Sequence, residues 1–266
     1  MFSFFMGLGF LLGSIFLYFI SAIVSGHFQT FANTSLFYSV LAGMLWAFAS
    51  IFLLSSVDRI GLARSNQWKN LQGPVGVILS LIILSEFLRT NALFAVLAGF
   101  SVFVSALFLN IKHSDGKKVE LKGIIFAVLS AILFGVVTVL NKFVTDNSGV
   151  YTQLAVWSFF TFITIAIYIL SKQDLRRELL LIEKKDIRLG FIGGLLYSLA
   201  GFLMLKSYSY IPAAISFTII QLNALWVITI GIVFFKEIDF KKNIWRILGG
   251  IIFAAIGVLL LFYAKK

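Results

Sequence analysis

Cysteine is absent from the 266-residue chain, and charged residues make up only 12% of it. The absence of cysteine excludes disulfides and thiolate metal sites. The few charges cannot cover a soluble core of this size, because 60% of the residues are hydrophobic. We therefore predict that lipid surrounds most of the chain.

Enzyme motifs are also missing. The two histidines, His27 and His113, lie far apart in the sequence, and no Walker loop or metal-ligand spacing occurs. The serines have no histidine near them at membrane depth, so a Ser–His hydrolase would have no base. The sequence predicts no catalytic residue, no metal and no cofactor.

Long apolar runs replace these features. Runs of about 20 residues match a hydrocarbon core of about 30 Å, whereas barrel strands would alternate over about ten residues. In lipid the backbone must satisfy its own hydrogen bonds, so we predict an all-α membrane protein. The first run, 1–24, is too long for a signal peptide and is predicted to be retained. The candidate transmembrane helices are 1–24, 36–56, 68–88, 91–111, 122–143, 151–171, 189–208, 212–235 and 245–264.

The basic residues predict the orientation. Of the 22 Lys and Arg residues, 17 fall in alternate connections, a group that includes Arg59, Arg64 and Lys69. Cytoplasmic loops carry such an excess, so the N-terminus is predicted inside and the C-terminus outside a plasma membrane. The net charge of +11 then indicates contact with anionic lipid and no nucleic-acid partner.

An internal repeat organises the chain. A shift of 151 residues aligns 41–109 with 192–260, pairing Gly43 with Gly194 and Glu86 with Glu237. The matched helices run in opposite directions under the predicted topology. Inverted repeats of this kind are typical of secondary transporters, with the substrate bound between the repeats.

The repeat divides the chain into three parts, 1–111, a cytoplasmic linker at 112–121, and 122–266, within one membrane domain. The same shift leaves helix 122–143 without a counterpart at the front. We therefore expect nine transmembrane helices, derived from a ten-helix, five-plus-five bundle that lacks its first helix.

Carboxamides at membrane depth are the main candidates for substrate binding, because buried polar groups are costly in lipid. Asn70 and Gln72 overlie Gln221 and Asn223 in the repeat, and amides suit a neutral polyhydroxyl solute because they both donate and accept. Pro74 lacks an N–H and is predicted to free the Asn70 carbonyl as a further acceptor. The alternative is that these amides only join packed helices.

Aromatic and acidic residues complete the predicted site. Trp46, Tyr197 and Trp157 are candidates for stacking on a substrate, with ordinary packing as the alternative. Glu86 and Glu237 end their helices about 24 Å from the amides, so they are assigned structural or gating roles.

Several short motifs resemble the drug/metabolite transporter superfamily, the EamA-like group. These are Gly43-Met-Leu-Trp46, Ile60-Gly-Leu-Ala-Arg64, Leu84-Ser-Glu86, residues 211–221 and residues 234–237. Gln72 and Gln221, each upstream of a terminal glutamate, are similar to the glucose/ribose porter branch. The resemblance implies a ten-helix bundle in which the helices of Trp46 and Tyr197 line a central cavity. This chain departs from it by lacking the first helix and its Trp-Gly-Ser-like motif.

These features together predict an alternating-access transporter of a small polar metabolite, preferentially a sugar. Two alternatives remain open. The solute is an amino acid or an amphipathic drug, or the chain is a non-transporting nine-helix subunit. The predicted partners are the small-molecule substrate and membrane lipid, and the sequence leaves a homo-oligomer open.

Overall fold

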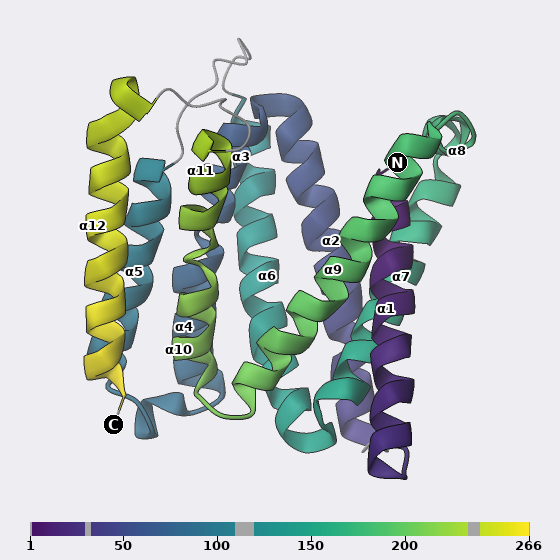
Figure 1. Ribbon diagram of the computed structural model, residues 1–266, viewed down its shortest axis with the longest axis horizontal. Coiled ribbons are helices and arrows are strands. Elements are labelled where there is room, and N and C mark those ends of the chain that lie inside the picture. The colour runs from purple at the N-terminus through teal and green to yellow at the C-terminus, as the bar shows by residue number, and fades with distance from the viewer. Residues whose placement is uncertain (1, 30–32, 110–119, 234–239, 266) are drawn as a thin grey trace. The chain divides into compact units, whose positions relative to one another are not determined.

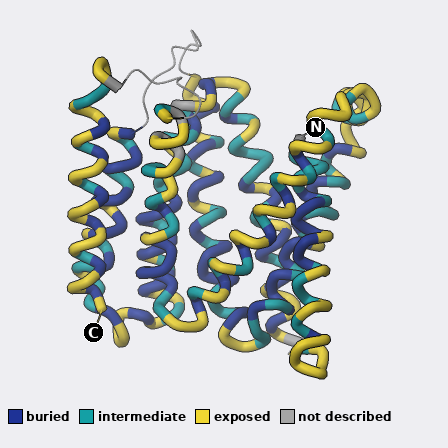
Figure 2. The backbone as a smooth tube through the Cα atoms, viewed as in Figure 1, coloured by how far each residue is buried: buried dark blue, intermediate teal, exposed yellow. Residues whose placement is uncertain are grey.

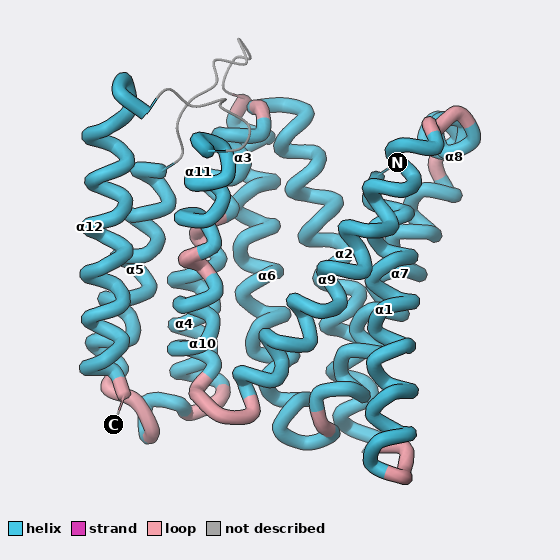
Figure 3. Tube along the Cα trace, viewed as in Figure 1, coloured by secondary structure: helices cyan, strands magenta, loops and turns pink. Residues whose placement is uncertain are grey.

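The computed structural model describes residues 2–29, 33–109, 120–233 and 240–265 of the chain. Over these residues the chain forms helices and short connections (Figure 1 and Figure 3), with one isolated bridge between Thr90 and Lys265. Seven of the described helices are long and apolar enough to cross a bilayer. The prediction of an all-α, multi-pass membrane protein is confirmed, and the count of nine helices stays a prediction.

The helices are α1 (Phe2–Ser25), α2 (Asn33–Ile60), α3 (Leu62–Lys69), α4 (Gln72–Ile83), η1 (Glu86–Leu88), α5 (Ala92–Leu109), α6 (Leu121–Ser148), α7 (Val150–Ser171), α8 (Gln173–Leu180), α9 (Lys184–Tyr208), α10 (Ala213–Ile220), α11 (Asn223–Val233) and α12 (Phe240–Ala264). The longest, α2 and α6, have 28 residues each. At 1.5 Å per residue each spans about 42 Å, so their ends extend beyond a hydrocarbon core of about 30 Å.

Two of the predicted spans are interrupted. The span predicted at 68–88 consists of α3 and α4, which cover 62–83, and the span predicted at 212–235 contains α10 and α11. Lys69, which the sequence assigned to a loop, lies in the last turn of α3. Both differences arise because hydropathy averaged over a whole span does not detect a break of two residues.

Pro74 helps to determine where α4 begins. It occupies the first turn of α4, where a helix needs no N–H donor. We predicted that the Asn70 carbonyl would stay free, but the N–H of Gly73 donates to it over 3.2 Å. The prediction was wrong because the chain tightens at the break into a bond between residues three apart.

The two breaks occur at equivalent positions. The bounds of α3 and α10 differ by the 151 residues of the repeat, and their C-caps adopt the same conformation: φ −65° and ψ −12° at Asn70, φ −67° and ψ −12° at Gln221. After each cap, the N–H of a leucine bonds the carbonyl three residues back over 3.1 Å. The pair α3–α4 descends in Figure 1 and the pair α10–α11 ascends. This part of the chain keeps the register of the predicted repeat.

The chain forms two compact units. The first unit comprises Met1–Phe48 with Leu140–Tyr210, and the second comprises Ala49–Val139 with Ile211–Lys266. The chain therefore passes from one unit to the other within α2, within α6 and after α9. Each unit combines helices from both predicted repeats.

In the first unit, glycines allow α1 and α9 to pack closely. A Cβ atom added at Gly9 would lie 2.2 Å from the carbonyl oxygen of Phe191, and one at Gly194 would lie 2.1 Å from that of Met6. Neither position can accept a larger side chain without moving a backbone. Small residues serve this purpose in membrane helices, where van der Waals packing drives association.

In the second unit, α5 packs on α12. The hydroxyls of Ser101 and Ser105 on α5 each donate over 2.7 Å to a carbonyl on α12, those of Phe253 and Gly250. Figure 2 shows exposed residues at every turn of α12, on its side away from α5. The core of this unit is formed by Val77, Leu81, Ala95, Ala98, Ala214, Ile215, Leu261 and Ala264.

Candidate solute-binding site

Two glutamine side chains meet at the helix breaks of the second unit. Nε2 of Gln72, in the first turn of α4, donates to Oε1 of Gln221, the C-cap of α10, over 3.0 Å. Both residues are buried, at 7% and 8% exposed. Each carboxamide has more donors and acceptors than this bond uses, so the pair retains capacity to bind a hydroxyl group.

A cavity of about 10 Å³ adjoins this pair. It is lined by Asn70, Gly73, Gly99, Val102, Phe103, Ala106, Thr218 and Gln221. A space of this size is at the lower limit for one ordered water, so a sugar requires it to widen. Because Thr218 and the α5 residues are apolar or weakly polar in the sequence, sequence reasoning missed them. The only signal was the small size of Gly99 and Ala106.

Asn223 does not join this group. It begins α11, is exposed, and is not among the residues that line the cavity. The repeat relates it to Gln72, but only Gln72 is buried. The structure thus brings together three of the four predicted amide residues, Asn70, Gln72 and Gln221.

The predicted aromatic residues gather in the first unit. The Phe10 ring centroid lies 4.9 Å from that of Tyr197, 5.1 Å from that of Trp157 and 6.4 Å from that of Trp46. The Trp46 and Tyr197 rings are 5.4 Å apart, and their side chains share a hydrogen bond. Rings at these separations are in contact. Phe10, one of 30 phenylalanines, carried no signal in the sequence.

One donor in this aromatic cluster has no acceptor among the described residues. Trp157 is 1% exposed, and its indole Nε1 has no hydrogen-bond partner in the part of the chain that is described. Buried N–H groups nearly always bond to protein, water or ligand. The Trp157 N–H can therefore donate to an acceptor other than the described residues.

Three buried polar side chains in the first unit form a hydrogen-bonded chain that was not predicted from the sequence. Nε2 of Gln153 donates to Oδ1 of Asn141 over 2.6 Å, and the Ser39 hydroxyl donates to Oε1 of Gln153. All three residues are at most 1% exposed, and they join α2, α6 and α7. Asn141 is followed by a lysine near a predicted helix end, and this context does not indicate a buried network.

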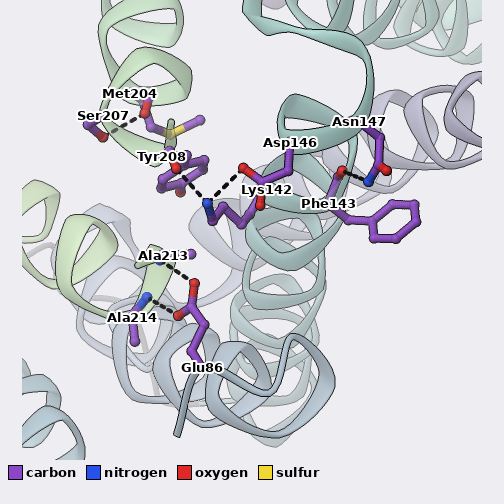
Figure 4. Close-up of polar contacts among 10 residues, drawn as sticks. All are labelled: Glu86, Lys142, Phe143, Asp146, Asn147, Met204, Ser207, Tyr208, Ala213 and Ala214. Atoms are coloured by element: carbon purple, nitrogen blue, oxygen red, sulfur yellow. Dashed lines mark hydrogen bonds and ion pairs between the residues drawn. The ribbon is translucent and has the colours of Figure 1, made fainter. Parts of the chain in front are cut away.

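Glu86 caps a helix. Its Oε1 accepts from the backbone N–H of Ala213 over 2.6 Å, and its Oε2 accepts from that of Ala214 over 2.9 Å (Figure 4). Both donors belong to the first turn of α10, where backbone N–H groups have no helical partner. The repeat-related Glu237 lies outside the described residues, so its assignment stays a prediction.

Lys142 binds the C-terminal end of a helix, whereas Glu86 binds an N-terminal end. Its Nζ donates to the carbonyl of Tyr208, the last residue of α9, over 2.6 Å and to Oδ1 of Asp146 over 2.8 Å (Figure 4). A cation is favourable at a helix C-terminus, where carbonyls are left without partners. Lys142 therefore stabilises the end of α9.

Lys69 lies next to the first helix break. Its Nζ is 5.7 Å from the centroid of the Phe134 ring of α6, a separation at which a cation is attracted to an aromatic face. Its basic charge assigns Lys69 to a loop, although the predicted span 68–88 includes it, and the structure places it in the last turn of α3. The corrected start at Leu62 places this charge within the α3–α4 pair.

Metal ligands are not grouped in the described ranges: no three His, Asp or Glu side chains come together there. His27 is exposed in a turn after α1, and His113 lies outside the described residues. The amides that come together in the second unit can donate to and accept from hydroxyl groups, and the buried indole N–H of the first unit can donate to them.

Comparison with known proteins identifies the family to which the chain belongs. A family model described as "Sugar transport protein" matches residues 6–264. The chain is also similar to a solved structure described only as a crystal structure of a protein, with a TM-score of 0.70 over 97% of this chain and 88% of that chain. At 14% identity this likeness concerns the fold alone. No curated protein matches the chain in sequence.

Proposed function

Because the chain belongs to the sugar transport protein family, we propose that it carries a sugar across the plasma membrane by alternating access. The family match over 6–264 is the observation that carries this proposal. The seven long apolar helices are consistent with it, since a carrier must span the bilayer repeatedly.

The sugar binds, in this proposal, at the cavity beside Gln72 and Gln221. Sugar hydroxyls would take over the hydrogen bond that the Gln72 amide now donates to the Gln221 amide. The Thr218 hydroxyl, already bonded to the Ala214 carbonyl, and the Asn70 amide supply further polar groups. At its present volume the cavity holds at most one water, so the proposal requires this site to widen to admit the solute.

We further propose that the chain descends from the five-plus-five inverted repeat of the drug/metabolite transporter superfamily. The support is the matching break after α3 and α10, together with their opposite directions in Figure 1. A missing leading helix stays a prediction. In the proposed orientation, the connections that hold 17 of the 22 Lys and Arg residues lie in the cytoplasm. This orientation rests on loop charge alone.

Uptake into proteoliposomes tests the function. Purified protein is reconstituted, and initial rates are measured for labelled hexoses and pentoses and, separately, for labelled amino acids. We expect saturable uptake of at least one neutral sugar and none into empty vesicles. Saturable uptake of amino acids alone would instead support the alternative solute, and no saturable uptake of any solute would support the non-transporting subunit.

A further inference from the structure

We propose that Glu86 is a positioning residue for the sugar site: it fixes the short helix α10 and thereby sets where Gln221 lies. The inference rests on the proposed function, because the site that Gln221 serves is the sugar site. Glu86 itself does not line the cavity.

The first step of the argument is the length of α10. It has eight residues, or about 12 Å, and Gln221 is its C-cap. The N-cap residue is Pro212, and no side chain within the helix caps it. Glu86 supplies that function from η1, as a carboxylate that is 5% exposed and accepts two backbone N–H groups. Negative charge is favourable at this end of a helix.

The second step is that α10 is held at both ends by residues at the start of α4 and just after its end. Gln72 begins α4 and bonds Gln221, while Glu86 follows α4 and bonds Ala213 and Ala214. A displacement of α10 along α4 must therefore break one of these contacts.

The third step is the packing between these contacts. A Cβ atom at Gly76 of α4 would lie 2.8 Å from the Phe217 ring of α10, and one at Gly73 would lie 3.3 Å from Cγ of Gln221. α10 thus packs closely against α4, because the two glycines of α4 have no side chains that would keep the helices apart. Because the helix is short and closely packed, release of its first turn is transmitted to Gln221 at its last.

The substitution Glu86→Gln tests the role. The amide keeps the size of the carboxylate but cannot accept from both N–H groups in the same way. We expect KM for sugar uptake to rise about tenfold with kcat within about twofold, the effect of losing roughly one charge-assisted hydrogen bond on binding. The matched control is Glu120→Gln, whose exposed carboxylate pairs with Arg59 over 3.1 Å. KM in the control should not change.

Two double variants separate positioning from simple stabilisation. If Glu86 acts through Gln221, E86Q combined with Q221A should raise KM no more than Q221A alone, and additive effects would overturn the proposal. Adding Pro212→Ser to E86Q gives α10 its own N-cap acceptor. We expect thermal stability to recover while KM stays high, because the new cap does not tie α10 to η1. Recovery of both would show that Glu86 is only a cap.

Hydrogen exchange provides a measurement that does not need transport. Amides of 213–221 in purified E86Q should exchange at least about threefold faster than in the unsubstituted protein, up to and including Gln221. Faster exchange confined to Ala213 and Ala214, or none, would overturn the proposal. Should the unsubstituted protein transport no sugar, the proposed function fails while this exchange result still decides whether Glu86 positions α10. If E86Q does not fold, Glu86→Asp, which keeps the charge but shortens the reach, replaces it.

Discussion

Gln72 and Gln221 lie 149 residues apart in the sequence and share a buried hydrogen bond of 3.0 Å. Each residue lies at a break between two short helices. The bond therefore connects the α3–α4 break to the α10–α11 break. Breaks of this kind leave backbone groups without helical partners near a solute, an arrangement that transporters use at their binding sites.

Replacing Gln72 by alanine should weaken sugar binding. In the proposal the change removes one of the two amides that bond the sugar hydroxyls, a loss of about 1–3 kcal/mol or roughly 5- to 150-fold in KM. Uptake kinetics in proteoliposomes measure it, with Gln173→Ala, at the exposed start of α8, as the control. Unchanged KM in the Gln72 variant would contradict the assignment of the amide pair.

Replacing Gly194 by valine should destabilise the first unit. The added Cβ would lie 2.1 Å from the Met6 carbonyl oxygen, so α1 and α9 must separate. We expect a loss of about 1–3 kcal/mol, observed as a lower melting temperature in detergent. Ala200→Val places the same final side chain at an exposed position of α9 and should have little effect. Equal melting temperatures for the two variants would contradict the close approach.

Replacing Lys142 by methionine should lower stability without changing selectivity. The Tyr208 carbonyl loses its donor, at a cost of about 1–3 kcal/mol. Thermal unfolding in detergent measures this, and Lys206→Met, which removes a cation 5.4 Å from the Tyr210 ring centroid, is the control. A normal melting temperature combined with altered solute preference would show that Lys142 binds substrate.

Single cysteines test the orientation, because the chain has none of its own. Tyr210 is 74% exposed after α9, and Arg177 is exposed in α8. The charge bias places them on opposite sides of the membrane. A membrane-impermeant maleimide added to intact cells should label Tyr210→Cys and leave Arg177→Cys unlabelled until the cells are opened. The reverse pattern would invert the predicted topology.

The sequence predicted the helical class well because apolar runs of the right length leave little choice in lipid. It failed at 68–88, because a break of two residues between α3 and α4 leaves the average hydropathy of the span unchanged. Pro74 was the available signal. Its missing N–H predicts a free carbonyl, whereas in the structure Pro74 lies in the first turn of a new helix.

The candidate site was predicted in part for a similar reason. The repeat paired Asn70 with Gln221 and Gln72 with Asn223, and residue type identified the aromatic candidates. Neither indicates which side of a helix faces a neighbour, so Asn223 was included although it is exposed, and Asn141 was omitted although it is buried. Glu86 was correctly placed at a helix end, but its partner α10 begins 127 residues later and could not be predicted from spacing.

The mixed composition of the two units has a consequence for biogenesis. α1 packs on α7 and α9, and α5 packs mainly on α12, so these two early helices find their main partners among late ones. A ribosome delivers α1 to α5 to the membrane before those partners exist. The glycine faces of the nascent helices must then wait in lipid, or be shielded by the insertion machinery, until the second half of the chain has been synthesised.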